Sequence, residues 1–65
     1  MMSVEEARKL RKGDYVLYQG LRYKVLHTKE HRSASTNELY IIVKCSRIGG
    51  TYRFGNEFVE LCKED

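Results

Sequence analysis

Apolar positions recur every three residues near the start of the chain, at the spacing of one narrow helical stripe. The stripe consists of Val4, Ala7 and Leu10. Ser3 and Glu6 stand at capping-box spacing, since the Ser3 hydroxyl can accept a hydrogen bond from the N–H of Glu6 while the Glu6 carboxylate reaches back to Ser3. The pattern predicts a short helix over about residues 4–11 that docks through three side chains.

Beyond Gly13, where a glycine stop for this helix is expected, the period changes from three to two. Strand-forming residues alternate with polar ones in five runs, which are DYVLYQ, RYKVLHT, NELYIIVKCSR, TYRF and FVELC. Turns are expected at Gly20, at IGG over 48–50 and at GN over 55–56, and the polar stretch 29–37 predicts one long, mobile loop. We therefore expect a mainly-β fold, with a small barrel over about residues 14–62 of a single domain, 1–65.

Two stretches resemble a known class of barrel. GDYVLYQGLRYKV resembles the opening hairpin of SH3-like barrels, and GNEFVEL resembles their end, where a one-turn helix leads into the last strand. The chain has no tryptophan, no proline and no ALYDY-type strand, so it is closer to the bacterial, Tudor-like and KOW-like relatives than to signalling SH3 domains. The resemblance implies a five-stranded SH3-like barrel with a short N-terminal helix, and non-enzymatic binding of protein or nucleic acid.

Alternation divides the predicted strands into two faces. The face assigned to the interior carries Val16, Tyr18, Tyr23, Val25, His27, Leu39, Ile41, Val43, Cys45, Val59 and Leu61. The opposite side, called the outer face below, carries Tyr15, Leu17, Arg22, Lys24, Leu26, Tyr40, Ile42 and Lys44. The outer face is too apolar for a plain solvent face and too basic for a core.

Three interpretations of the outer face are open. In the first, the N-terminal helix covers Leu17, Leu26 and Ile42. In the second, the face is an interface with a protein partner or with a second copy of the chain. In the third, tyrosine rings and flanking cations form a nucleic-acid platform, on which bases stack while Lys and Arg neutralise phosphates. Tyr52 is a further candidate for contact.

The charge is uneven along the chain. Residues 1–37 hold eight basic and four acidic residues, a net +4, whereas residues 38–65 hold four basic and five acidic, a net −1. The main basic cluster consists of Arg8, Lys9, Arg11, Lys12, Arg22, Lys24, Lys29 and Arg32. Contact with phosphates is its functional interpretation, and a solvated helix end and loop is the alternative.

The histidines and cysteines do not form a recognised motif. His27 and His31 would lie about 13 Å apart on a strand, which is too far for one zinc ion, and Cys45 and Cys62 form no C-x-x-C pair. Cys45 and His27 are expected to be neighbours on one face, but a barrel this small leaves no cavity for a substrate. We expect no metal, no cofactor and no catalytic residue, and a small-molecule or metal site at His27 and Cys45 is the most distant alternative.

The composition is that of an ordinary globular protein, with 42% hydrophobic and 32% charged residues. The N-terminus carries acids and no apolar leader, so we expect a reduced, cytoplasmic protein without a membrane partner. The sequence favours a small binding or adaptor domain whose candidate contact residues are Tyr15, Arg22, Lys24, Tyr40 and Lys44. A protein partner or self-association is placed slightly ahead of RNA or DNA, and no small-molecule substrate is expected.

Overall fold

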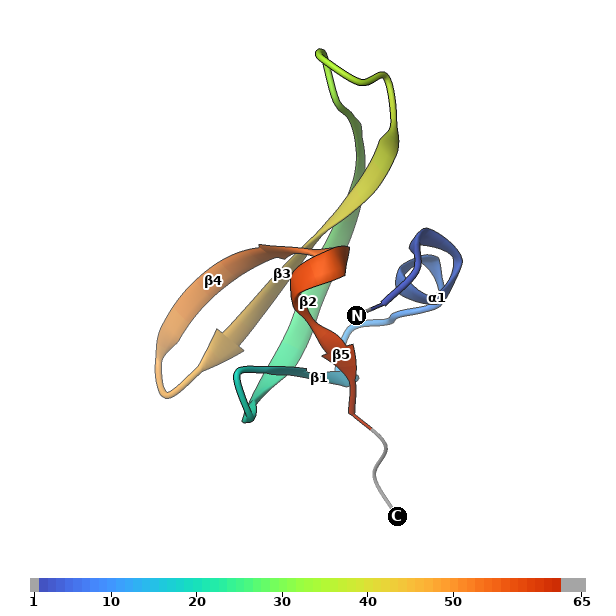
Figure 1. Cartoon of the computed structure of the whole chain (residues 1–65). Coiled ribbons are helices and arrows are strands. Elements are labelled where there is room, and N and C mark those ends of the chain that lie inside the picture. The colour runs from blue at the N-terminus through green and yellow to red at the C-terminus, as the bar shows by residue number, and fades with distance from the viewer. Residues whose placement is uncertain (1, 63–65) are drawn as a thin grey trace.

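The computed structural model describes residues 2–62 and contains one antiparallel sheet with a short helix beside it (Figure 1). The elements are α1 (Val4–Arg8), β1 (Tyr15–Tyr18), β2 (Leu21–Arg32), β3 (Leu39–Arg47), β4 (Gly50–Gly55), the 3-10 helix η1 (Asn56–Phe58) and β5 (Glu60–Leu61). The strand order in the sheet is β4-β3-β2-β1-β5. The predicted mainly-β fold with five strands and one short α-helix is confirmed.

The sheet coils strongly, but its backbone ladder stays open. Within residues 2–62, β4 and β5 are the two edges of the ladder, so hydrogen bonds do not close the sheet into a barrel. Tyr18 of β1 nevertheless stacks on Phe54 of β4 with ring centroids 4.2 Å apart, although two strands separate β1 from β4 in the sheet. Tyr23 stands edge-on to both rings. Aromatic side chains therefore join β1 to β4 across the inner side of the curled sheet.

The capping box forms as predicted. The Ser3 hydroxyl accepts from the N–H of Glu6 at 3.1 Å, and the Glu6 carboxylate accepts from the N–H of Ser3 at 2.9 Å. The helix ends at Arg8 rather than near residue 11, because the N–H of Leu10 bonds the Ala7 carbonyl in a tighter turn.

The glycine at position 13 has a different role from the one predicted. Gly13 has a φ of 100° and lies beyond the helix C-cap, Lys9. Its N–H donates to the Val25 carbonyl at 2.9 Å. Gly13 therefore turns the chain into the sheet and does not terminate α1.

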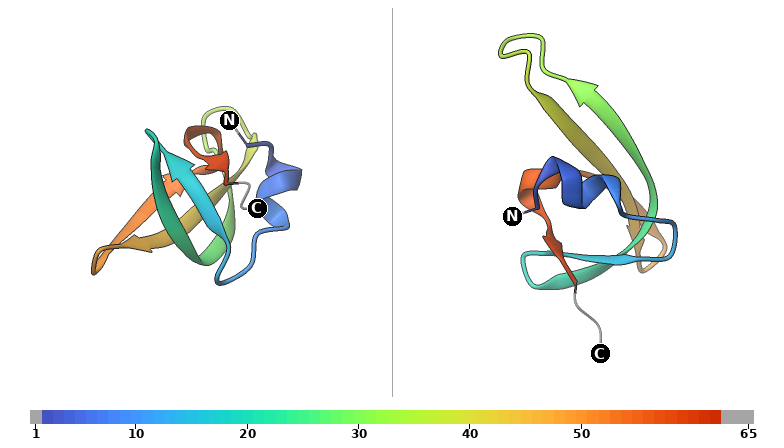
Figure 2. Two further views of the ribbon diagram at one scale, coloured as in Figure 1. Left: turned by 90° about the horizontal axis from the view of Figure 1, so that it is seen from below. Right: turned by 90° about the vertical axis from the view of Figure 1, so that its right-hand side faces the viewer.

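The helix α1 packs on the inner face of the sheet (Figure 2). Ala7 and Leu10 are buried there among the strand residues of the core, and Met2 is buried beside them. The interpretation in which α1 covers Leu17, Leu26 and Ile42 is therefore wrong. The physical reason is that β1 has four residues and β2 has twelve, so the inner side of the longer β2–β3 hairpin needs another cover.

A β-bulge in β2 decides which side chains face the core. The pairing register with β3 shifts between Val25 and His27, so that Leu26 is the extra residue. Val25 is fully buried, whereas His27 is exposed and pairs with Lys44. The predicted interior position of His27 is wrong, because simple alternation does not allow for an inserted residue.

Most of the other interior positions are confirmed. The buried ones are Val16, Tyr23, Val25, Ile41, Val43, Cys45 and Val59. Tyr18 and Leu39 are half-buried. Leu61 pairs with the buried Val16 and so lies on the predicted inner side, but it remains 44% exposed and is not part of the core. It belongs to an edge strand of two residues, with little structure above it to cover its side chain.

The long loop predicted over 29–37 is shorter than expected, because its first four residues are strand. Residues 29–32 belong to β2 and extend the β2–β3 hairpin into an arm (Figure 1). At the tip, the N–H of Ser33 donates to the Glu38 carbonyl at 2.9 Å, and the N–H of Asn37 donates to the Ser33 carbonyl at 2.8 Å. Ladder hydrogen bonds and the stacking of His31 on Tyr40, with centroids 5.5 Å apart, outweigh the polar composition of this segment.

One buried polar side chain ties the fold together. Asn56, at the start of η1, accepts a hydrogen bond from the N–H of Ile41 at 2.9 Å and donates one to the Met2 carbonyl at 2.8 Å. The N–H of Met2 also donates to the Asn56 carbonyl at 3.2 Å. The N-terminal segment, β3 and η1 are thus joined at one residue.

Candidate functional site

Cross-strand partners arrange the outer face in rows, because paired residues of an antiparallel sheet point to the same side. We call Arg53 of β4, Lys44 of β3 and His27 of β2 the basic row, since each is the partner of the next. One row toward the arm lie Gly55, Ile42 and Lys29, and beyond them Tyr40 and His31. In the other direction lie Thr51, Ser46, Lys24 and Tyr15.

Positive charge is concentrated on this face. Of the seven Lys or Arg of strands β2, β3 and β4, five lie on the outer face by their pairing, and the single acid of these strands is Glu30. The five are Arg22, Lys24, Lys29, Lys44 and Arg53. Glu30 is paired with Ile41 and so faces the inner side, where it accepts from Arg8 Nε at 2.7 Å. In these three strands, therefore, the outer face carries cations and no carboxylate. A surface of this kind attracts polyanions.

All five contact residues predicted from the sequence lie on the outer face. Tyr15 and Lys24 are cross-strand partners, and the Arg22 guanidinium lies over the Tyr15 ring at 4.9 Å. Tyr40 and Lys44 lie on β3, two rows apart. Within residues 2–62 no helix packs over these positions, since α1 occupies the inner side.

The basic cluster predicted from the sequence is divided in space. Arg8 ends α1, which packs on the inner side of the sheet, and Lys9 is its C-cap, while Arg11 and Lys12 are exposed in the turn that follows. Lys29 lies on the outer face, as the partner of Ile42. Arg32 donates to the Asn37 carbonyl at 2.8 Å at the tip of the arm. These cations therefore do not form one surface.

Sequence reasoning missed several members of the outer face. His27 was placed on the inner face because alternation did not allow for the bulge, and Lys29 and His31 were not assigned to a face because 29–37 was predicted to be a loop. Arg53 could have been found, since it alternates with Tyr52 and Phe54 in a short strand pattern.

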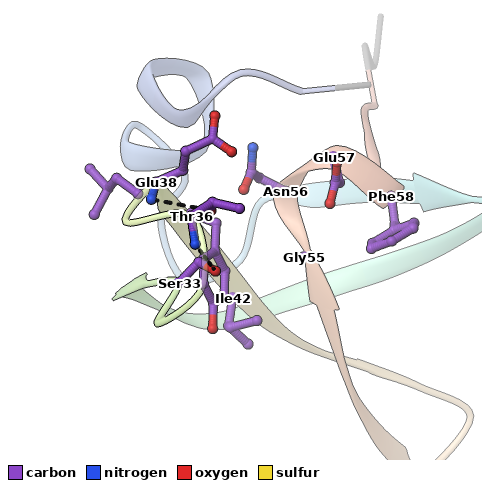
Figure 3. A pocket seen from close by; sticks show the side chains of 10 residues that line it. Ser33, Thr36, Glu38, Ile42, Gly55, Asn56, Glu57 and Phe58 are labelled. Carbon is purple, nitrogen blue, oxygen red and sulfur yellow. Dashed lines mark hydrogen bonds between the residues drawn. The ribbon is translucent and has the colours of Figure 1, made fainter.

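Two open depressions adjoin each other on this side of the molecule. One, of about 460 Å³, overlies the basic row and is lined by His27, Lys29, His31, Ile42, Lys44 and Arg53. The other, of about 500 Å³, lies between the tip of the arm and η1 (Figure 3). Its lining includes Ser33, Thr36, Glu38, Tyr40, Ile42, Glu57 and Phe58. Ile42 lines both depressions, so the two meet at this residue.

Phe58 has an unusual position for a large apolar residue. Its side chain is 63% exposed. A Cβ atom placed on Gly55 would lie 3.3 Å from Phe58 Cδ2, so the ring rests against the backbone of Gly55. Gly55 is the cross-strand partner of Ile42. The ring is therefore held at the edge of the outer face without being part of the core.

Tyr52 lies on the other side of the sheet from Tyr15 and Tyr40. It is the partner of Cys45, and its ring meets Tyr23 edge-on with centroids 5.4 Å apart. It extends the inner aromatic group formed by Tyr18, Tyr23 and Phe54. Tyr52 is 44% exposed, but it does not contribute to the outer face.

The His27 and Cys45 pair considered as a small-molecule or metal site is not formed. Cys45 is fully buried on the inner side as the partner of Val25, whereas His27 is on the outer face. Burial raises the pKa of the Cys45 thiol, which reduces its thiolate fraction. Residues 2–62 contain no group of three His, Cys, Asp or Glu side chains placed to hold a metal ion.

Within the same residues, no helix has the length and apolar character needed to span a bilayer. No protein-family model, no curated protein and no solved structure matches this chain.

Proposed function

We propose that this chain is a non-enzymatic binding module that holds nucleic acid on the outer face of its sheet. The observation that supports this function is the basic row, in which His27 and Arg53 are exposed and Lys44 is half-buried. The exposed Lys24 and Lys29 lie beside it, on a face that α1 does not cover. Phosphate groups would lie along the row, and their negative charge would replace the counterions that the row otherwise attracts.

An SH3-like assignment of the open sheet is part of the same proposal. The β1–β2 hairpin and the one-turn helix η1 before β5 lie where the resemblance expects them. Small barrels of this type present their strands and loops to macromolecules and need no deep cavity. A binding function on the strand surface agrees with that architecture.

Nucleic acid is preferred to a protein partner because of the residue types on the face. The cores of protein interfaces are depleted in Lys, whereas phosphate contacts are made chiefly by Lys and Arg. Lys24, Lys29 and Lys44 all lie here, next to Arg53. With α1 on the inner side, the charges remain open to a polyanion.

The test is a binding titration of labelled RNA and DNA strands by fluorescence anisotropy over a range of salt concentrations. We expect log K to fall linearly with log salt concentration, and each phosphate contact removed by mutation to lower the slope by about one. Lys44→Glu is expected to weaken binding of all strands and to flatten this slope.

Lys12→Glu is the matched control, because it changes the net charge by the same amount in the turn that follows α1. It is expected to bind nearly as well as the natural protein. Equal weakening by both substitutions would show that only the total charge matters. No binding of any strand at low salt would overturn the function and return the outer face to a protein partner.

A further inference from the structure

We infer that the depression between the arm tip and η1 is a nucleobase site, so that the ligand of the outer face is a single strand rather than a duplex. This inference rests on the function proposed above and specifies the nucleic acid that the outer face binds. The strand would lay its phosphates along the basic row and turn one unpaired base into the depression.

The two parts of the site are adjacent. Ile42 borders the depression over the basic row and also the depression toward η1. It stands two residues before Lys44 on the same strand and the same face, about 6.6 Å away along β3. A nucleotide whose phosphate rests on Lys44 therefore has its base beside Ile42 and the aromatic rings beyond it.

Aromatic surfaces are available for the base. The Phe58 ring is exposed and rests on Gly55, and Tyr40 reaches the same depression from β3. His31 stacks on Tyr40 with an interplanar angle of 17°, which holds the Tyr40 ring in place. Stacking on such rings accepts any base, because every base has a π face.

The charges of the two depressions favour different parts of a nucleotide. Glu38 and Glu57 line the depression toward η1, and Figure 3 shows Glu57 between Asn56 and Phe58. Carboxylates repel a phosphate but accept hydrogen bonds from the N–H groups of a base edge. The basic row has the opposite preference. The phosphate is therefore directed to Lys44 and Arg53 and the base to Phe58.

A duplex satisfies only half of this arrangement. Its bases are paired and stacked, so their Watson–Crick edges and faces are not free to enter the depression. Phosphates of a duplex would still reach the basic row. Single strands are therefore expected to bind more tightly than duplexes, by the contribution of base stacking.

The experiment compares three labelled ligands of about eight nucleotides, a length within the usual range of single-strand sites. They are an intact single strand, the same strand with abasic positions, and the duplex. The natural protein is expected to bind the intact strand roughly tenfold more tightly than the abasic strand or the duplex. Phe58→Ala is expected to remove this preference, and Phe58→Trp to keep it.

Ile48→Ala is the matched control, because Ile48 is an exposed apolar residue at the opposite hairpin end, 86% accessible. It is expected to leave the preference unchanged, and circular dichroism melts confirm that each variant folds. Equal binding of all three ligands, with Lys44→Glu still weakening each, would overturn the nucleobase site and leave the phosphate-binding function intact. Failure of every ligand to bind would overturn both.

Discussion

Ile48 is held in a backbone conformation that a β-branched residue rarely adopts. Its φ is 49°, and the following Gly49 has a φ of 76°, which is the pairing of positive angles needed by a two-residue hairpin turn. Gln19 and Gly20 form the β1–β2 turn in the same way, with φ of 51° and 79°. Both turns were predicted from their glycines, and the one over 48–50 included Ile48, but the positive φ of the isoleucine was not predicted.

The strain at Ile48 leads to a stability prediction. Ile48→Asn is expected to raise the free energy of unfolding by about 1 kcal/mol, because asparagine tolerates the left-handed region better than isoleucine. The side chain is 86% exposed, so little buried surface is lost. Urea denaturation measures the change. Ile48→Val keeps the branch at Cβ and should give no such gain; an asparagine variant no more stable than the valine variant would contradict the assignment of strain.

At the scale of the elements, helices and strands were predicted correctly where neighbouring residues alone specify them. Alternation and turn residues predicted β1, β4 and the hairpins, and the capping box predicted the start of α1. The bulge at Leu26 was not predictable, because it depends on how β2 pairs with β3. The docking side of α1 was also missed. The helix has five residues and little stability of its own, so contacts with distant strands decide where it lies.

The capping box gives α1 a dependence on pH. Hydrogen bonds from the backbone N–H and then the side chain of Ser3 lower the pKa of the Glu6 carboxyl below its ordinary value of 4.5. Because the folded pKa is the lower one, the stabilisation is fully present above about pH 4.5 and is lost as the pH falls through the folded value.

Glu6→Gln tests this dependence. Near pH 7 the natural protein is expected to be the more stable, and the difference should close as the pH is lowered below 4.5. Chemical denaturation at a series of pH values gives the two curves. Glu5→Gln is the control, since Glu5 lies in the same helical turn and the capping box is made by Glu6. Equal stability of the two proteins at pH 7 would show that Glu6 contributes only as a neutral hydrogen-bond acceptor, a role that glutamine also fills.

At the scale of the whole molecule, the fold sorts charges that the sequence mixes. The sequence shows a basic first half and a slightly acidic second half. In the structure, Arg8 meets Glu30 on the inner side, while Lys44 and Arg53 from the acidic half join Lys24 on the outer face. The five contact residues were predicted to share a face, and they do. The depression beside Phe58 was not predicted, because its walls come from the arm tip, β3 and η1.

The same scale explains the role of Asn56. It joins the N-terminal segment to β3 and η1, so its loss affects the packing of the whole chain. Asn56→Ala is expected to lower the free energy of unfolding by roughly 2 kcal/mol, because the buried N–H of Ile41 and the carbonyl of Met2 lose their partner. Thermal and urea unfolding measure the loss.

The neighbouring Glu57→Ala is the control for Asn56, since Glu57 is exposed and its loss is expected to change stability by less than about 0.5 kcal/mol. Equal effects of the two substitutions would mean that the two hydrogen bonds of the Asn56 side chain do not stabilise the fold.

The bulge at Leu26 restricts which sequence changes this chain can accept in evolution. Side chains along β2 alternate, so the side on which Lys29 and His31 emerge depends on whether the number of residues after Val25 is odd or even. Substitutions at Leu26 preserve that parity. Deletion of one residue there would exchange the sides of the arm, placing Lys29 against the core and Glu30 among the cations. Evolution is therefore expected to keep the number of residues in β2 at this position more strictly than the identity of residue 26.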